Sequence, residues 1–403
     1  MPMFDERLQA SFSPLFAIRQ AGPHAERKRV FTHVYSNSTI ANSVELAELL
    51  TTIGKDRLLP RLKKFAKKGD SVEAFSLTRE YSMDIVTAYI YGMENGTNFL
   101  QNPGEGAHHR SAFLHAAEPW AFYASTELPW LVYVLGYFRL NLVSPSIGSA
   151  FDIIHSFVLD LTTRKISSLE INRVSGRGSW GTFEHIWQRL DYIPEAQKAS
   201  LIASDMVDQI YAGHLATGTV LTYLMWELSR NPQIQDILRN DLKSSSDPRS
   251  SELLDAVLME TIRLYPAGFG PFPRVAPENA TVSGFRIPKG TIASASPYML
   301  GRNPDIFPSP DSWLPKRWIQ ASPEERQEMR QWVWMFMSGP RVCIGEHLAV
   351  IVYWLIFAAM KAFVVDVYES YKTTIVGDPD MRQLESFFST PAGASLRLQL
   401  QVI

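Results

Sequence analysis

The only cysteine of this 403-residue chain, Cys343, lies in the segment FMSGPRVCIG. A lone cysteine cannot form a disulfide within the chain, so it is an inert buried residue, a nucleophile or a metal ligand. Gly339 and Gly345 permit tight turns and the close approach of a flat ligand. The run EHLAVIVYWLIFAAMKAF predicts a helix directly after the cysteine, and a helix N-terminus stabilises a thiolate. With Arg341 and the flat side chain of Phe336 nearby, a thiolate here suits axial ligation of a flat macrocycle that carries carboxylates.

A cysteine nucleophile is the alternative chemistry for this loop. Such a nucleophile needs a histidine base within reach. His347 lies four residues after Cys343, on the next turn of the predicted helix, but the sequence offers no third group to orient it. The nucleophile therefore remains open as a second interpretation.

The bulk composition excludes several classes of protein. The net charge of -2 provides no basic field, so we expect no nucleic-acid partner. One cysteine excludes a disulfide scaffold. The longest apolar stretch, Leu348 to Met360, is shorter than the roughly 20 residues that a bilayer requires. Because Asp5 and Glu6 stand where a signal peptide is apolar, we expect a soluble, cytoplasmic chain.

The elements that must position these residues are mainly helical. The segments VELAELLTTIGKDRLLPRLKKFAKKG and SLTREYSMDIVTAYIYG have helical periodicity, and a long helix is predicted over 194–230. The segment ATVSGFRIPKGTIASAS predicts two short strands around a Pro-Lys-Gly turn, and residues 395–402 alternate as a strand. We therefore expect a single, mainly α domain over residues 1–403 with a small β region.

The loop at 336–345 matches the pattern F-x-x-G-x-R-x-C-x-G in full, at Phe336, Gly339, Arg341, Cys343 and Gly345. This pattern resembles the heme-binding signature of the cytochrome P-450 family. The resemblance implies heme b with its iron held by the cysteine thiolate, O2 as co-substrate and an NADPH-dependent flavoprotein reductase as electron donor. Members usually lie on the cytoplasmic face of the endoplasmic reticulum. Since this chain starts close to the segment PHAERKRVF, the fold expected is that of the family without its N-terminal anchor and first sheet and helix.

Further matches to the family concern structural residues. Glu260 and Arg263 in METIRLYP lie three residues apart on one helical face, where they can pair. The family buries such a pair together with an arginine from a later loop, and Arg317 in LPKRW resembles that third member. The resemblance implies a structural role, in which the three residues hold the loop that leads to Cys343.

Several cations match positions that contact the heme carboxylates in the family. Arg274, in FPRVAPENATVSG, matches an arginine on the first strand after the paired helix, and Arg341 is a further candidate. His24 and Lys28 match a ring-bearing residue and a cation four positions later. The near alternatives to these two are Arg27 and Arg29.

The long helix contains YAGHLATGT, which resembles the oxygen-binding motif A-G-x-acid-Thr-Thr of the family. Gly213 matches its glycine, but Leu215 stands in place of the acid and Ala216 in place of the first threonine. Mid-helix glycine costs about 1 kcal/mol relative to alanine, and close approach of the helix to heme would explain it. Thr217 or His214, with ordered water, would then carry the protons. These departures leave room for a variant reaction, such as ring expansion, desaturation or cyclisation.

By family position, the substrate faces the segment before Gly213 and the segments 266–272 and 387–393, which are apolar or small. They predict an apolar small-molecule substrate, and the long helix resembles that of filamentous-fungal members that serve secondary metabolism. The leading hypothesis is a heme-thiolate monooxygenase. The alternatives are a truncated heme-binding chain with little or no turnover, and a cysteine-nucleophile enzyme.

Overall fold

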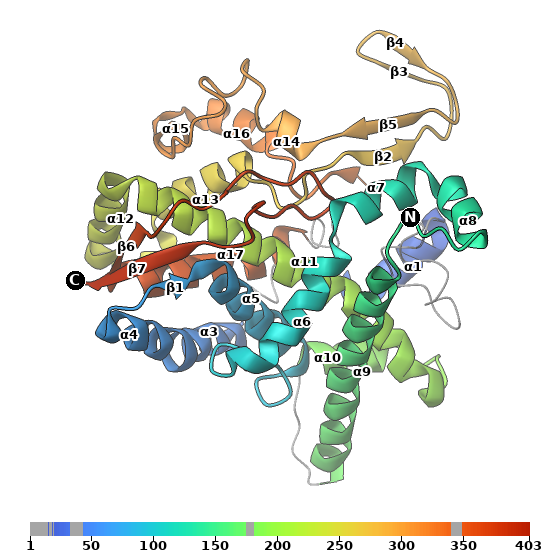
Figure 1. Cartoon of the computed structure of the whole chain (residues 1–403), viewed down its shortest axis with the longest axis horizontal. Helices are drawn as coiled ribbons and strands as arrows, with labels where there is room; N and C mark the ends of the chain where they lie inside the picture. Colours follow the sequence, from blue (N-terminus) through green and yellow to red (C-terminus); the bar gives the residue numbers. More distant parts are fainter. Residues whose placement is uncertain (1–14, 16–17, 19, 33–42, 175–180, 340–348) are drawn as a thin grey trace.

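The structure is a computed structural model, and it describes residues 15, 18, 20–32, 43–174, 181–339 and 349–403. Helices dominate these residues and the strands form small sheets, so the predicted mainly helical fold with a small β region is confirmed (Figure 1). In the described part of the chain, no helix is both long enough and apolar enough to cross a bilayer.

The helices differ widely in length, and the longest, α11, occupies the range in which the sequence predicts a long helix. The segment from Val44 to Lys68 is helical throughout, as predicted, with a π-helical turn in its middle. In chain order the helical elements are α1 (Ala21–Thr32), α3 (Val44–Thr52), η3 (Ile53–Leu58), α4 (Leu59–Lys68), α5 (Ala74–Tyr91), α6 (Pro103–Ala116), α7 (Pro119–Glu127), α8 (Pro129–Tyr137), α9 (Pro145–Val174), α10 (Thr182–Arg189), α11 (Glu195–Arg230), α12 (Pro232–Ser244), η4 (Pro248–Ser250), α13 (Glu252–Leu264), α14 (Pro297–Leu300), α15 (Lys316–Gln320), α16 (Pro323–Trp332) and α17 (Ala349–Tyr368).

The strands form one three-stranded sheet, in the order β1-β7-β6, and two antiparallel pairs, β2-β5 and β3-β4. The β3-β4 hairpin lies at the edge of the molecule opposite the projecting end of α9 (Figure 1). The strands are β1 (Val72–Glu73), β2 (Phe272–Val275), β3 (Ala280–Val282), β4 (Phe285–Ile287), β5 (Ile292–Ala295), β6 (Tyr371–Ile375) and β7 (Arg397–Val402).

The prediction of two strands around the Pro-Lys-Gly turn is wrong in its pairing. The segment contains three strands, and β3 and β4 pair through a turn at Ser283 and Gly284, both of which have positive φ. The strand after Pro-Lys-Gly, β5, pairs with β2 instead of β4. The Pro-Lys-Gly turn therefore connects two different sheets. The residues of the turn do not determine that β5 pairs with β2, because β2 is distant in the sequence from the turn.

Helices α5 and α11 form the centre of the fold. Fifteen of the eighteen residues of α5 are buried. Thr78 Oγ1 of α5 lies 3.1 Å from Gly218 O and 2.8 Å from Thr222 Oγ1, both on α11. Tyr81 donates from its hydroxyl to Ala359 O of α17 at 2.9 Å. These buried bonds attach α5 to α11 on one side and to α17, the helix that follows the cysteine loop, on the other.

Asp366 on α17 makes the stability of this core dependent on pH. Its carboxylate lies against Gly54 of η3, and its Oδ2 has no hydrogen-bond partner among the described residues. Burial raises the pKa of Asp366 from 3.8 to about 6. The folded protein therefore binds more protons than the unfolded chain between about pH 4 and 6, and its free energy of unfolding falls as the pH rises through that window.

Asp366→Asn is expected to remove this contribution. The variant should match the wild type near pH 4 and exceed its free energy of unfolding by up to about 3 kcal/mol at pH 7.5. Urea unfolding across this pH range measures the difference. Asp70→Asn, at an exposed carboxyl, serves as the control and should leave the pH dependence unchanged. Parallel pH profiles for wild type and Asp366→Asn would contradict the assignment.

Candidate functional site

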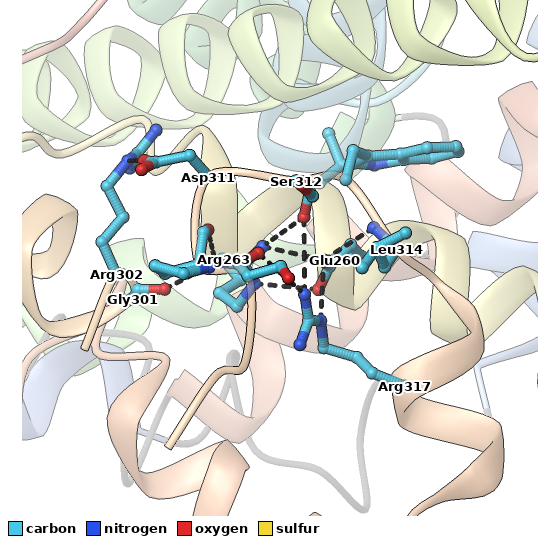
Figure 2. A network of polar contacts seen from close by, with 12 residues as sticks. Glu260, Arg263, Gly301, Arg302, Asp311, Ser312, Leu314 and Arg317 are labelled. Carbon is cyan, nitrogen blue, oxygen red and sulfur yellow. Dashed lines mark hydrogen bonds and ion pairs between the residues drawn. The ribbon is translucent and has the colours of Figure 1, made fainter. Parts of the chain in front are cut away.

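The carboxylate of Glu260 on α13 is the centre of a buried polar network (Figure 2). Its side chain and that of Arg263 are fully buried, and Arg317 joins them from α15. Glu260 accepts five hydrogen bonds of 2.8 to 3.0 Å, from Arg263 Nε and Nη2, Arg317 Nε, Leu314 N and Trp318 Nε1. The three side chains that the sequence groups together therefore meet around one carboxylate.

The remaining donors of the two arginines bind backbone carbonyls. Arg263 donates to the carbonyls of Gly301 and Pro310 at 2.6 Å and of Ser312 at 3.0 Å. Arg317 donates to the carbonyl of Pro308 at 2.8 Å. A Cβ at Gly301 would lie 2.5 Å from the carbonyl oxygen of Arg263, so only glycine fits there. The network thus fastens α13 to the irregular chain between α14 and α15.

This network satisfies the conditions under which buried charges are tolerated. Removing a carboxylate and two guanidinium groups from water is costly unless they are paired and hydrogen-bonded. Here every oxygen of Glu260 is paired, and these charge-assisted bonds are the stronger class of hydrogen bond. The sequence analysis did not identify Leu314 N and Trp318 Nε1 as donors. The position of Trp318 directly after Arg317 is the one sequence signal that could have indicated the tryptophan.

The segment that leads to the cysteine is described as far as Gly339. Phe336 packs, partly buried, against the hydrophobic core. Trp334 Nε1 donates to Ser338 Oγ at 3.0 Å. Gly339 has φ of 75°, a left-handed conformation that glycine adopts without strain. The other members of the predicted signature, Arg341, Cys343 and Gly345, lie outside the described residues.

Arg274 on β2 lies beside this segment. Its Nη2 is 3.5 Å from Met337 Sδ, and its Nη1 donates to the carbonyl of Pro273 at 2.9 Å. Partial burial lowers the pKa of the guanidinium below its usual value. Among the described residues no carboxylate forms an ion pair with Arg274. Arg274 contacts Met337, which lies six residues before Cys343 in the sequence. A cation in this position is suited to bind an acidic group of a ligand.

Helix α1 carries the N-terminal candidates and is attached to α11 by an ion pair between Arg27 and Asp205. His24 is buried and Lys28 is partly exposed. Arg27, one of the near alternatives, is paired with Asp205. The roles of His24 and Lys28 stay predictions.

Along α11, a stripe of residues is less buried than its surroundings. Asp208, Gln209 and Ala212 are partly exposed, and Ala216 is 9% exposed, whereas most residues around them are fully buried. Residues 208, 212 and 216 are four apart, so they share one face of the helix. Ala212 and Ala216 are small, so a flat group packed on this face would approach the helix axis closely.

Gly213 has a different neighbour from the one that the sequence suggested. A Cβ at this position would point to α5 and lie 3.0 Å from Val86 Cγ2. Glycine here therefore allows α5 and α11 to pack closely. The expected approach of Gly213 itself to heme stays a prediction.

His214 and Thr217 are buried, at 1% and 3% exposure. The imidazole of His214 packs edge-on against Phe113 of α6, with ring centroids 4.8 Å apart. Burial, with the nearby charges of Arg79 and Arg110, lowers the pKa of His214 well below 6.5, so the ring is neutral. The structure therefore separates His214 from the small-residue face at Ala212 and Ala216, and the proton-carrying roles of His214 and Thr217 stay predictions.

The three segments that the sequence assigned to a substrate pocket converge. Ser389 donates its backbone N–H to Ala267 O at 2.7 Å, and Thr219 Oγ1 of α11 donates to Ser389 O at 3.1 Å. Aromatic rings surround this junction, with centroid distances of 5.5 Å for Phe272–Phe387 and 5.4 Å for Tyr211–Phe388. An apolar wall thus forms where α11 meets the two loops.

These described residues fit a heme group. A planar macrocycle needs a helix face of small residues, and Ala212 with Ala216 provides one. A heme carboxylate needs a cation with free donors, and Arg274 provides one beside the segment that leads to Cys343. The ligand to the iron would be the Cys343 thiolate, as the signature predicts.

Comparisons with known proteins show the family of the chain. The family model described as "Cytochrome P450" matches residues 16–374. The chain is 26% identical to "Cytochrome P450 3A12" of Canis lupus familiaris over 324 residues, which cover 76% of this chain and 61% of that protein. It is 24% identical to "Cytochrome P450 monooxygenase FGM1" of Gibberella zeae over 421 aligned positions, which cover 99% of this chain and 78% of that protein.

The chain thus spans about three fifths of the length of the first of these relatives. The family model nevertheless covers most of the chain, including α1, the Glu260 network, the cysteine signature and α17. This chain belongs to the cytochrome P450 family.

Proposed function

We propose that this chain is a heme-thiolate monooxygenase that oxidises an apolar small molecule with O2 and with electrons from a separate NADPH-dependent flavoprotein reductase. The observation that carries the proposal is the complete heme-binding signature around Cys343 in a chain of the cytochrome P450 family. The heme, when bound, supplies the redox chemistry that activates oxygen. The residues of the chain hold it, exclude water from it and deliver protons near it.

Each part of the site has a place in this proposal. Cys343 holds the iron, Arg274 binds a heme carboxylate, and His24 with Lys28 reaches a carboxylate from α1. Ala212 and Ala216 give the flat ring access to α11. The aromatic wall around Phe272 and Phe387 supports an apolar substrate. Oxidation of a secondary metabolite, by hydroxylation or by a rearrangement such as ring expansion, is the specific reaction that we infer.

A ferrous–carbonyl spectrum of the purified protein tests the cofactor, and product formation tests the turnover. A thiolate-type Soret band together with substrate-dependent consumption of NADPH and an oxygenated product supports the monooxygenase. The same band without turnover, in the presence of a competent reductase, supports the alternative of a truncated heme-binding chain. A protein that binds no heme when porphyrin is plentiful contradicts both.

Arg274→Gln is expected to weaken heme retention. The variant loses a charge-assisted bond to a carboxylate, which is worth about 1.5–3 kcal/mol, so heme should transfer to an excess of a heme-scavenging apoprotein about ten to a hundred times faster. Arg286→Gln, on the exposed strand β4, is the matched control and should leave the transfer rate unchanged. Equal transfer rates for the Arg274 variant and wild type would remove Arg274 from the heme site.

Thr217→Val is expected to uncouple reductant consumption from product formation. The variant keeps the shape of the side chain but removes the hydroxyl that we propose to pass protons, so product per NADPH should fall at least tenfold. The control is Thr163→Val, at an exposed threonine of α9 whose hydroxyl donates to Leu159 O, and it should leave the ratio of product to NADPH unchanged. An unchanged ratio of product to NADPH in Thr217→Val would refute the relay through this residue.

A further inference from the structure

A small cavity between α5, α6 and α11 contains an arginine with no hydrogen-bond acceptor. The cavity has a volume of about 10 Å³, close to the space that one water-sized sphere needs. It lies on the side of α11 where His214 packs, away from the face formed by Ala212 and Ala216. Its charged, polar and apolar lining includes Arg79, Glu80, Arg110, His214, Met83 and Phe99.

Arg79 is only 1% exposed, and its Nε, Nη1 and Nη2 atoms all lack a hydrogen-bond partner in the described structure. The guanidinium carbon of Arg79 lies 4.4 Å from the centroid of the Phe75 ring, which is a cation–π contact. The ring is not a conventional hydrogen-bond acceptor, so this contact does not satisfy the five N–H donors of the guanidinium. A Cβ at Gly218 of α11 would lie 2.9 Å from Arg79 Cγ, so glycine makes the space for this side chain. A buried charge without acceptors is among the most unfavourable features that a core can contain.

The nearest carboxylates do not neutralise Arg79. Glu80 is already shared by two other guanidinium groups, with Arg110 Nη1 at 2.6 Å from Oε1 and Arg61 Nη1 bonded to Oε2. Glu73 caps the start of α5, where its carboxylate accepts the backbone N–H groups of Phe75 and Ser76. The cavity lining therefore contains two guanidinium groups, of Arg79 and Arg110, against the single carboxylate of Glu80, and it has an excess of positive charge.

The charge of Arg79 persists at neutral pH. Burial lowers the pKa of its guanidinium to about 9, which is still well above 7. His214, which also lines the cavity, has no hydrogen-bond partner at Nδ1 among the described residues and is buried and neutral. A neutral imidazole carries one N–H donor. In the tautomer with its proton on Nδ1, His214 adds a second donor to the cation, while both oxygens of Glu80 in the lining are already bonded to Arg110 and Arg61.

We propose that this cavity binds one halide ion, chloride in the cell, between the Arg79 guanidinium and His214 Nδ1. The size of the cavity favours a monoatomic anion, since phosphate, sulfate and carboxylates need more space. Water fits by size but cannot balance a buried positive charge. The bound ion would join α5 and α11, and it would stabilise the folded protein increasingly as its concentration rises above the dissociation constant. The anion site does not depend on heme, because it lies on the side of α11 away from Ala212 and Ala216.

Bromide is the direct probe for this site. In crystals of the holoprotein grown in sodium bromide, anomalous scattering measured at the bromine edge should show a peak within hydrogen-bond distance of Arg79 and His214 Nδ1. A protein side chain or a water without anomalous signal at that position would overturn the proposal.

Thermal unfolding in solution provides a second and independent test. In sodium chloride the midpoint of unfolding of the wild type should rise and saturate, by about 2–5 °C relative to sodium gluconate of equal ionic strength. Arg79→Met, which replaces the cation by an apolar side chain of similar length, should lose this chloride dependence. Arg164→Met, at an exposed arginine paired with Asp160, is the control and should keep it. An equal chloride response in wild type and Arg79→Met would refute the site, and so would a wild type that responds equally to chloride and gluconate.

Discussion

Cys343→Ser is expected to abolish the thiolate-type ferrous–carbonyl spectrum and to lower turnover by more than about 100-fold. A serine hydroxyl is a much weaker anionic donor than a thiolate, so iron would lose the ligand that tunes its redox chemistry. The expected loss exceeds the roughly 10- to 100-fold cost of removing an outer partner of a metal ligand. The spectrum, the heme content and the product yield should be measured on the same preparation.

The companion variant for this experiment is His347→Ala. It leaves the thiolate in place, so the heme-ligand assignment predicts an unchanged spectrum. The nucleophile interpretation predicts the opposite pattern, in which His347→Ala and Cys343→Ser both abolish activity in a protein that contains no heme. A Cys343→Ser protein that retains both the spectrum and the activity would show that the iron ligand is another residue.

Glu260→Gln is expected to lower the free energy of unfolding by about 3–5 kcal/mol, because it leaves two buried guanidinium groups without their counter-charge. An amide is also a poor replacement in geometry, since its NH2 group would face donors. Both carboxylate oxygens of Glu260 face N–H donors, among them Arg263 Nε at 2.9 Å and Trp318 Nε1 at 2.9 Å. Urea unfolding followed by far-ultraviolet circular dichroism measures the loss.

The same helix offers a matched control in Glu252→Gln. Glu252 pairs with Arg326 at 2.9 Å, but its side chain is 63% exposed. An exposed pair contributes about 0–1 kcal/mol, so this variant should unfold close to wild type. Because the Glu260 network holds the chain between α14 and α15, the Glu260 variant should also bind less heme per protein. A loss for Glu260→Gln no larger than that for Glu252→Gln would mean that the network is not a stability determinant.

Helix α11 separates two environments that the linear motif AGHLATGT does not distinguish. Residues 212 and 216 share a face with small side chains and partial exposure, whereas Gly213 and His214 pack toward α5 and α6. Successive residues on a helix are about 100° apart, so neighbours in a motif point in different directions. Leu215 and Ala216 thus place apolar side chains on α11 where the family pattern has polar ones. His214 does not replace them, because its side chain lies away from the face formed by Ala212 and Ala216.

The sequence alone determined the mainly helical class, the extent of the long helix, the continuous helical run from Val44 to Lys68 and the family. These features are local, because periodicity, caps and a ten-residue signature each lie within one stretch of chain. The sequence also grouped Glu260, Arg263 and Arg317, although the grouping came from the resemblance and not from spacing.

Only the tertiary structure decided which residues meet across the chain. It paired β5 with β2, it added Leu314 N and Trp318 to the donors around Glu260, and it turned His214 toward Arg79. The physical reason is that each of these contacts joins residues that are distant in the sequence, and its partner is selected by packing and by the pairing of buried charges. A charged residue in an apolar helical pattern, such as Arg79 in α5, is the one local sign that such a contact must exist.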